Sequence, residues 1–180
     1  QPYYTSDKTW PPRYYQRVAV NRTIAAIARG EQRLLLAMAT GTGKTYTAFQ
    51  IVYRLLKSGT KKKVLYLADR NFLVDTSIQQ DFAPLEKSIY KVNYATADPA
   101  TITSHEVYFA LYQQLAGENE DEPHYKELFA PDFFDLVIVD ECHRGSAKAD
   151  STWRTILEYF SPATQIGMTA TPKETKYISN

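Results

Sequence analysis

The stretch LLLAMATGTGKTYTAFQ, residues 34–50, constrains the possible folds of this chain more than any other feature. It begins with a fully apolar run, residues 34–39, that predicts a buried strand. A loop of glycines and threonines follows, and apolar side chains then recur at helical spacing over residues 43–57. A strand, a glycine-rich loop and a helix in this order are typical of phosphate-binding loops, because the loop amides and the helix N-terminus present N–H donors to an anion.

The loop itself, MATGTGKT, predicts a site for ATP with Mg²⁺. Gly41 and Gly43 let the backbone approach phosphate oxygens, and Lys44 is long enough to reach the β and γ phosphates. We assign Lys44 a catalytic role as well, and Thr45 the role of a Mg²⁺ ligand. The first position of the usual G-x-x-x-x-G-K-[ST] pattern is Met38 here, so a glycine turn with a solvated lysine is the alternative. Three neighbours complete the ATP-binding residues predicted in this loop: Thr40, Thr42 and Tyr46.

A second stretch, DLVIVDECHRG, predicts a strand over residues 136–139 that ends in two carboxylates. Mg·ATP chemistry needs one carboxylate at the metal and one group that orients the attacking water. Adjacent side chains point to different sides of a strand end, so we assign Asp140 to the metal and Glu141 to the water, both as catalytic residues. Two solvated acids at the end of a strand are the alternative.

Cys142 and His143 follow these acids and raise the question of a zinc site. The chain has one cysteine and three histidines, too few for the usual closed structural site. We therefore expect Cys142 to be a small, buried, apolar side chain. His143 lies beside Glu141 in the sequence and is predicted to relay the state of the nucleotide to another segment. A single cysteine also excludes an internal disulfide and fits a reducing compartment such as the cytoplasm.

Predicted strands and helices alternate along the chain. Further strands are expected at residues 64–68, 89–94, 106–111 and 165–168, and further helices at residues 13–29, 71–80 and 151–159. The strands are apolar on both faces, which is typical of an α/β fold with a mostly parallel sheet and helices on both faces. Ligands of such sheets bind at the carboxyl ends of the strands, where both the glycine loop and Asp140 are expected.

Length and composition are those of one soluble globular domain: 180 residues, of which 44% are hydrophobic. No window reaches ~18 consecutive apolar residues, so no membrane partner is expected. Lys and Arg number 21 against 20 Asp and Glu, so any contact with nucleic acid must be local. Residues 1–12 are expected to form an extended lead-in or linker, broken by Pro11 and Pro12. No signal peptide is visible. Because the chain begins with Gln1 and not with Met, we expect it to be an excised or processed piece.

The chain resembles superfamily 2 helicases. Four segments occur in the order of the motor motifs of that superfamily: Gln16 with Arg17, MATGTGKT, DECH at 140–143 and TAT at 169–171. The sequence around them is similar to the R subunit of type I restriction-modification enzymes, over nearly the whole chain after about Pro12. The similar segments are LADRNFLVD, VYFALYQQL, FFDLVIVDECHRGS, WRTILEYF and QIGMTATPKET.

The resemblance implies a RecA-like P-loop NTPase fold, with residues 13–180 as the first RecA-like helicase motor domain, the ATP-binding lobe. The family's R subunit is an ATP-dependent translocase of double-stranded DNA fused to a nuclease, and it works with methylation and specificity subunits. Neither that endonuclease domain nor the second RecA-like lobe is expected in this chain. Because the family's arginine fingers lie in the second lobe, the isolated lobe is expected to bind nucleotide, hydrolyse it poorly or not at all, and cut nothing.

The resemblance also implies roles for individual residues. Gln16 matches the adenine-sensing glutamine, and Tyr14 or Tyr15 is expected to pack on the base, with Tyr15 included in the predicted site. Arg70 falls where the family contacts the DNA backbone. The alternatives are an ordinary exposed glutamine for Gln16 and a surface cation at a helix start for Arg70. Two residues match the motif that couples hydrolysis to DNA movement: Thr169 and Thr171.

Three other functions stay open at this point. The loop and the DECH segment are shared with superfamily 2 helicases that unwind duplexes or RNA. The lobe alone is also compatible with a nucleotide-gated docking module for DNA and partner subunits, whose DNA contacts would weaken steeply with salt. A small-molecule kinase is the remaining alternative, and the DECH and TAT segments argue against it.

Overall fold

The computed structural model describes residues 2–6, 10–68, 76–117, 123–140 and 147–170. Within these residues the strands form one six-stranded sheet in the order β1-β6-β5-β2-β4-β3. Every neighbouring pair is parallel, which confirms the predicted parallel sheet. The strands are β1 (Arg33–Ala37), β2 (Val64–Ala68), β3 (Ile89–Lys91), β4 (Val107–Leu111), β5 (Leu136–Asp140) and β6 (Thr164–Thr169).

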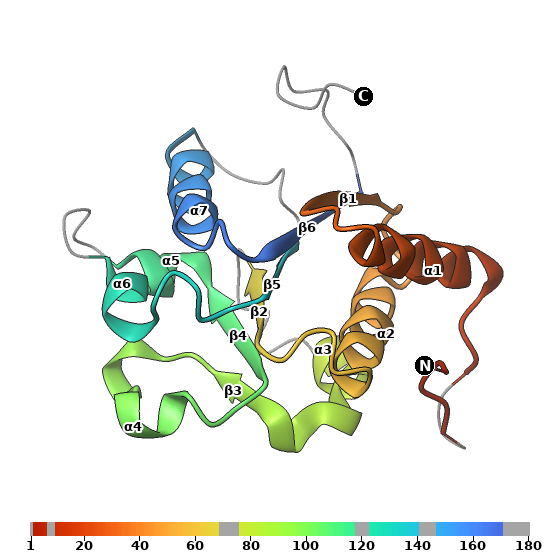
Figure 1. Ribbon diagram of the computed structural model, residues 1–180, viewed down its shortest axis with the longest axis horizontal. Helices are drawn as coiled ribbons and strands as arrows, with labels where there is room; N and C mark the ends of the chain where they lie inside the picture. The colour runs from red at the N-terminus through yellow and green to blue at the C-terminus, as the bar shows by residue number, and fades with distance from the viewer. Residues whose placement is uncertain (1, 7–9, 69–75, 118–122, 141–146, 171–180) are drawn as a thin grey trace.

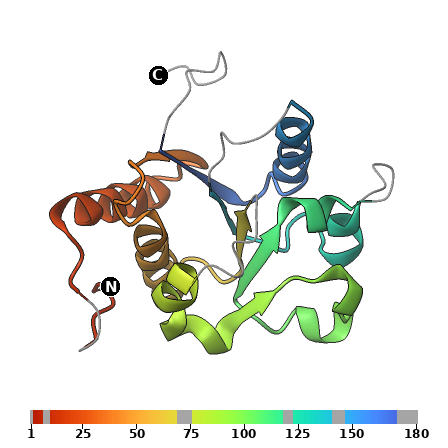
Figure 2. The ribbon, with the colours of Figure 1, turned by 180° about the vertical axis from the view of Figure 1, so that it is seen from behind.

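Helices cover both faces of the sheet (Figures 1 and 2). One face carries α1 (Tyr14–Ala28), α2 (Lys44–Lys57) and α3 (Thr76–Asp81), and the other carries α5 (Tyr112–Ala116), α6 (His124–Leu128) and α7 (Ala147–Tyr159). Three short helices connect the strands near β3: η2 (Ala83–Ser88), η3 (Tyr94–Thr96) and α4 (Pro99–Ile102). No helix in the described part of the chain is both long enough and apolar enough to cross a membrane.

Two hydrophobic cores lie on the two faces of the sheet, because successive side chains of a strand point in opposite directions. Tyr66 of β2 belongs to the core beneath α1 and α2, whereas its neighbours Leu65 and Leu67 belong to the core beneath α7. All three side chains are buried. A strand that is buried on both faces needs apolar residues at every position, which explains the continuous run VLYLA.

The helix that follows the glycine loop is fixed by its apolar stripe. Ala48, Ile51, Val52 and Leu55 of α2 are buried at helical spacing and pack on the sheet. Fully burying a side chain such as Ile51 contributes about 1.5–3 kcal/mol. The helix ends at Lys57, where Ser58 and Gly59, with a φ of 71°, reverse the chain. The start of α2, and with it the end of the loop, is therefore held against the sheet.

Most expected elements are found within two residues of their predicted bounds, but two differ by three or more residues at one end. The strand expected over residues 89–94 ends at Lys91, because the side chain of Asn93 accepts a hydrogen bond from the Ala95 amide (3.1 Å) and starts η3. The helix expected from residue 151 begins four residues earlier, at Ala147. Of the helix expected over residues 71–80, the part before Thr76 lies outside the described residues.

The described part of the lead-in packs on the helices that follow it. The Tyr3 hydroxyl donates a hydrogen bond to Asn21 Oδ1 of α1 (2.7 Å). The Tyr4 ring meets Phe49 and Tyr53 of α2 edge-on, with ring centroids 5.5 and 5.1 Å apart. These contacts join the lead-in to the core beneath α1 and α2.

Candidate functional site

The glycine loop, Thr169 and Asp140 lie along one edge of the sheet. β6 lies between β1 and β5, and the register pairs Ala37 with Thr169 and Met168 with Asp140. The Met38 amide, at the start of the loop, donates to the Thr169 carbonyl (2.9 Å). The carboxyl ends of three adjacent strands therefore bring together two stretches that are about a hundred residues apart in the sequence.

The loop turns through two glycines in the left-handed region. Gly41 has a φ of 78° and Gly43 a φ of 81°, values that other residues adopt only with strain. Between them, Thr42 folds back on Ala39, whose carbonyl accepts from the Thr42 hydroxyl (2.6 Å). Gly43 is the N-cap of α2 and has no side chain that could cap this end of the helix. The first amides of α2, a helix of 14 residues, are thus directed at the loop and suit an anion.

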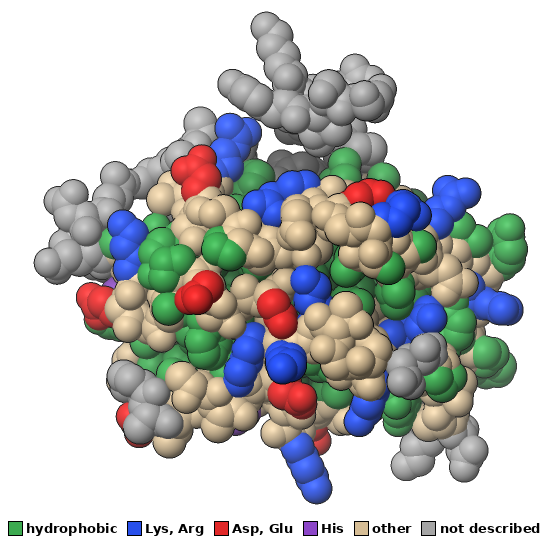
Figure 3. Space-filling view, in the orientation of Figure 1, with side chains coloured by type: hydrophobic (Ala, Val, Ile, Leu, Met, Phe, Trp, Pro, Cys, Tyr) green, Lys and Arg blue, Asp and Glu red, His purple; other side chains and the backbone are tan. Residues whose placement is uncertain are grey.

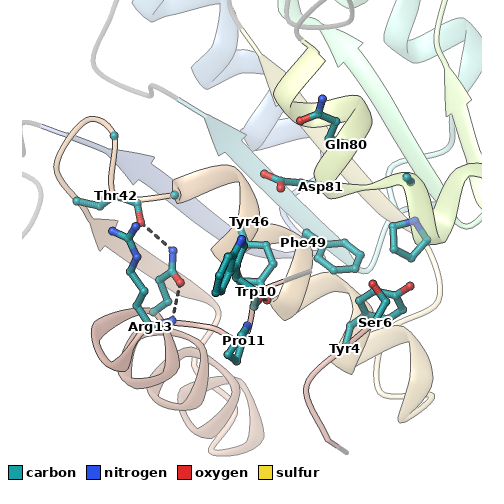
Figure 4. Close-up of a pocket in the computed structure, with 15 residues that line it drawn as sticks. Tyr4, Ser6, Trp10, Pro11, Arg13, Thr42, Tyr46, Phe49, Gln80 and Asp81 are labelled. Atoms are coloured by element: carbon teal, nitrogen blue, oxygen red, sulfur yellow. Dashed lines mark hydrogen bonds between the residues drawn. The ribbon is translucent and has the colours of Figure 1, made fainter. Parts of the chain in front are cut away.

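Gln16 joins the start of α1 to this loop. Its side chain is only 6% exposed. The Arg13 amide donates to Gln16 Oε1 (2.8 Å), and Gln16 Nε2 donates to the Thr42 carbonyl (2.9 Å). Figure 4 shows both bonds at one end of a cavity. The alternative of an ordinary exposed glutamine is therefore wrong, and Gln16 contacts the loop directly.

This cavity has a volume of about 1130 Å³ and lies between the lead-in, the loop and the end of α3. Two aromatic residues of the cavity, Trp10 and Tyr46, lie near its middle in Figure 4. Tyr15 does not line it: this side chain borders a second cavity between α1 and β1. Tyr14 is 81% exposed. The structure thus places Tyr46 in the lining of the cavity beside the loop, together with Trp10, which the sequence did not indicate. That Tyr46 binds ATP stays a prediction.

The carboxylate of Asp140 receives a hydrogen bond that the sequence analysis missed. The hydroxyl of Tyr66, a buried residue of the adjacent strand β2, donates to Asp140 Oδ2 (3.2 Å). The Tyr66 ring is held by Phe82, edge-on at 5.8 Å, and by Phe109 at 5.2 Å. The sequence feature that could have indicated this contact is the single tyrosine in the otherwise aliphatic strand β2. Its hydroxyl fixes the orientation of the carboxylate.

The remaining predicted residues divide into two groups. Lys44 and Thr45 form the first turn of α2, Thr40 is exposed at the start of the loop, and Thr169 is buried at the end of β6. Five residues lie outside the described residues, and their roles stay predictions: Arg70, Glu141, Cys142, His143 and Thr171.

The described residues include both predicted protein ligands of a magnesium ion, near the ends of two strands along one edge of the sheet. Among the described residues, no three His, Cys, Asp or Glu side chains lie close enough to hold a metal by themselves. Asp140 and the hydroxyl of Thr45 are the predicted protein ligands. Mg²⁺ keeps several waters and is usually held by one or two carboxylates together with substrate phosphates, so a larger acidic cluster is not required.

Gly43→Ala is expected to disturb the loop, and Gly59→Ala is its matched control. Both positions have positive φ, so alanine at either costs about 1–2 kcal/mol of strain. A Cβ at Gly43 would lie 2.4 Å from Gln16 Nε2 and displace the amide, whereas a Cβ at Gly59 meets nothing within 4 Å.

In urea unfolding we therefore expect both variants to lose the free energy of the backbone strain, and Gly43→Ala to lose more, because it also breaks the hydrogen bond from Gln16 Nε2 to the Thr42 carbonyl. Only Gly43→Ala should lose affinity for inorganic tripolyphosphate, by about tenfold, the equivalent of one hydrogen bond. Calorimetric titration measures this affinity. Equal tripolyphosphate affinities of the two variants would contradict the proposed role of the loop geometry.

Comparison with known proteins gives one family match. The family described as "Type III restriction enzyme, res subunit" matches residues 9–174 of the chain. Over all of its 180 residues the chain is 56% identical to the type I restriction enzyme EcoAI endonuclease subunit of Escherichia coli. The alignment covers 22% of that subunit, so the chain spans about a fifth of the length of this curated relative.

Two solved structures are similar over almost the whole chain. A fragment assigned as an HsdR subunit of a type I restriction enzyme from Vibrio vulnificus YJ016 is 40% identical, with a TM-score of 0.70, over 96% of this chain and 28% of that one. A nuclease-deletion mutant of the type ISP restriction-modification enzyme LlaGI, solved in complex with a DNA substrate mimic, is 25% identical. Its TM-score is 0.64, over 92% of this chain and 18% of that one.

Proposed function

The chain belongs to the family of the type III restriction enzyme res subunit, and from this premise we propose that it is the ATP-binding, RecA-like motor lobe of a type I restriction enzyme endonuclease subunit. It binds Mg·ATP and couples ATP hydrolysis to translocation of double-stranded DNA. One observation supports this most directly: the glycine loop, Thr169 and Asp140 lie side by side at the carboxyl ends of three adjacent strands. Since the chain spans about a fifth of its relative, the activity of the whole subunit is part of the proposal.

The loop holds the triphosphate in this proposal. Gly41 and Gly43 leave no side chain between the backbone and the phosphate oxygens. The amides of the first turn of α2 donate to the same anion, and Lys44 neutralises its charge. Thr45 and Asp140 hold Mg²⁺, which when bound neutralises charge that develops on the phosphates during hydrolysis. Glu141, which follows Asp140 in the sequence, orients the attacking water.

Thr169 links the nucleotide site to the rest of the lobe. Its side chain is buried, and its carbonyl accepts from the Met38 amide at the start of the loop. The preceding residue, Met168, is the register partner of Asp140. A displacement of the loop or of Asp140 would therefore displace the end of β6. This supports Thr169 as a residue that couples hydrolysis to movement. His143 and Thr171 are proposed for the same role from the sequence motifs alone.

We propose that the lobe moves along double-stranded DNA in the cytoplasm. Its proposed partners are the second RecA-like lobe, the methylation subunit and the specificity subunit. The type I relative is named as an endonuclease subunit and the LlaGI enzyme was solved with a DNA substrate mimic, which supports DNA as the substrate and an assembly of several subunits. On the face seen in Figure 3, Lys and Arg side chains are interspersed with Asp and Glu. We therefore propose that a few local residues contact the DNA backbone, with Arg70 among them.

Tyr66→Phe tests the proposed support of the metal ligand. The variant keeps the ring contacts with Phe82 and Phe109 and removes only the hydroxyl that orients Asp140. Removing a group that hydrogen-bonds to a metal ligand typically lowers metal affinity or activity by about 10–100-fold. We therefore expect kcat of the complete subunit to fall by about tenfold or more. Affinity for ATP measured without Mg²⁺ should stay unchanged.

The matched control is Tyr53→Phe, a tyrosine of α2 that packs on the same core. Its ATPase rate, measured with saturating duplex DNA, should equal that of the unaltered subunit. A Tyr66→Phe subunit with the control's rate would show that this hydroxyl does not support the metal site.

Two assays on the complete subunit with its partners test the proposed function. Duplex DNA should stimulate its ATPase activity, and ATP should drive displacement of a triplex-forming strand without separating the duplex. Absence of stimulation by duplex DNA would overturn the proposal. Displacement of an oligonucleotide from a duplex would instead identify the chain as the motor lobe of an unwinding helicase.

A further inference from the structure

A buried glutamine of α2 fastens the lead-in, here residues 2–6 and 10–12, to the lobe. Gln50 is fully buried. Its Oε1 accepts from the Tyr4 amide (2.9 Å), and its Nε2 donates to the Tyr4 carbonyl (3.0 Å). A side-chain amide that pairs with both backbone groups of one residue replaces the hydrogen bonds that a neighbouring strand would provide. The position of Tyr4 is thus set by α2.

The same glutamine is connected to Trp10 through Tyr46. Gln50 Nε2 also lies 2.9 Å from the Tyr46 hydroxyl, one helical turn earlier on α2. The Tyr46 hydroxyl donates to the Trp10 carbonyl (3.1 Å). Burial raises the pKa of the Tyr46 hydroxyl, so the group stays protonated and donates at neutral pH. The helix that starts at Lys44 therefore holds the lead-in at two points.

Trp10 has its backbone fixed and its side chain available to a ligand. The side chain is 89% exposed, yet it lines the cavity of the glycine loop together with Gly41 and Gly43. Figure 4 shows it beside Tyr46. A large aromatic side chain that stays exposed at a cavity wall offers an apolar face for a planar ligand. A nucleoside triphosphate with its phosphates on the loop would bring its base into this cavity.

We propose that Trp10 stacks on the base of the bound nucleotide, and that Gln50 is a positioning residue that holds Trp10 in place through Tyr46 and Tyr4. This inference rests on the proposed function, since it requires a nucleotide at the loop. It assigns the contact with the base to Trp10 in place of Tyr15, which borders the second cavity between α1 and β1. It also gives the lead-in a role in recognising nucleotide.

Calorimetry with two ligands tests the role of Trp10. Mg·ATP carries a base, whereas Mg·tripolyphosphate carries only the phosphates. Stacking of a base on an aromatic side chain typically contributes binding free energy equivalent to about a tenfold or larger change in affinity. We expect Trp10→Ala to weaken ATP binding by about tenfold and to leave tripolyphosphate binding unchanged, while the control Tyr15→Ala leaves both unchanged.

A loss of affinity in Trp10→Ala that is equal for both ligands, or no loss at all, would overturn the stacking role. Binding of neither ligand by the unaltered chain would instead show that the proposed function has failed. The two failures are therefore distinguishable.

Fluorescence gives a second, independent measurement. The chain has two tryptophans, so Trp153→Phe leaves Trp10 as the only one. ATP should quench this emission in a saturable manner, whereas tripolyphosphate should bind without quenching. Equal quenching by both ligands would contradict a contact between Trp10 and the base.

Gln50→Leu tests the positioning role, because leucine fills a similar volume but removes both hydrogen-bonding groups. We expect this variant to lose ATP affinity toward the level of Trp10→Ala and to keep its tripolyphosphate affinity. The double variant Gln50→Leu, Trp10→Ala should bind ATP no more weakly than Trp10→Ala alone, because Gln50 acts through Trp10. Additive losses in the double variant would overturn the positioning role.

Discussion

Lys44→Ala is expected to lower the affinity of the chain for Mg·ATP by about 100-fold or more while leaving the fold intact. Lys44 is the first residue of α2 and follows Gly43, so its side chain starts where the phosphates are proposed to lie. A hydrogen bond to a charged group contributes about 1.5–3 kcal/mol, and this lysine is proposed to pair with two phosphates. Such a loss corresponds to about two factors of ten in affinity.

Stability should change little in this variant, since the buried stripe of α2 begins after Lys44. Equilibrium dialysis with labelled ATP measures the affinity, and circular dichroism with urea unfolding checks the fold. Lys57→Ala, which removes an exposed lysine from the last turn of the same helix, is the matched control and should bind ATP normally. A Lys44→Ala chain that binds ATP as the control does would remove the basis for the glycine loop as the phosphate site.

Glu141→Gln is expected to separate ATP binding from turnover in the complete subunit. Glutamine keeps the size of the side chain but loses the charge and the basicity that orient and activate a water. We therefore expect ATP affinity to stay within about twofold, while kcat falls by about 100-fold or more, the contribution typical of general acid–base catalysis. Asp140 remains in this variant to hold the metal, so binding survives.

Steady-state ATPase assays with saturating duplex DNA, beside an ATP-binding assay, test this separation. Glu158→Gln is the control, because it makes the same change at an exposed position on α7. Full turnover in Glu141→Gln would show that another group orients the water. Loss of ATP binding together with turnover would show that Glu141 takes part in holding the metal.

Local sequence was sufficient to predict most of the fold. The strands β2, β4 and β5 are buried and almost entirely apolar, and α2 carries a clear helical stripe, so their order already indicated a parallel sheet. The run at residues 34–39, predicted to be a buried strand, forms the edge strand β1, which is largely exposed, whereas the buried β6 contains polar side chains. β3 was the weakest case: it has three residues, and the capping side chain of Asn93 ends the extended chain early. The start of α7 at Ala147 was missed because the apolar spacing begins only further along the helix.

The candidate site was predictable where one stretch of sequence forms it and not where distant residues meet. The glycine loop and Asp140 each follow from a local pattern, and parallel pairing puts both at one edge. Contacts such as that of Tyr66 with Asp140, 74 residues apart, depend on which strands are neighbours. The pairing of Tyr4 with Gln50 is equally non-local, and this is why the sequence indicated an extended lead-in or linker but not its contacts with α2.

The central claim, a nucleotide site formed within this lobe, is tested most directly by calorimetric titration of the unaltered chain with Mg·ATP. The arrangement of the loop, Gln16 and Asp140 predicts saturable binding of one ATP per chain. An absence of saturable binding would contradict it, because the edge of the sheet would then not form a nucleotide site by itself.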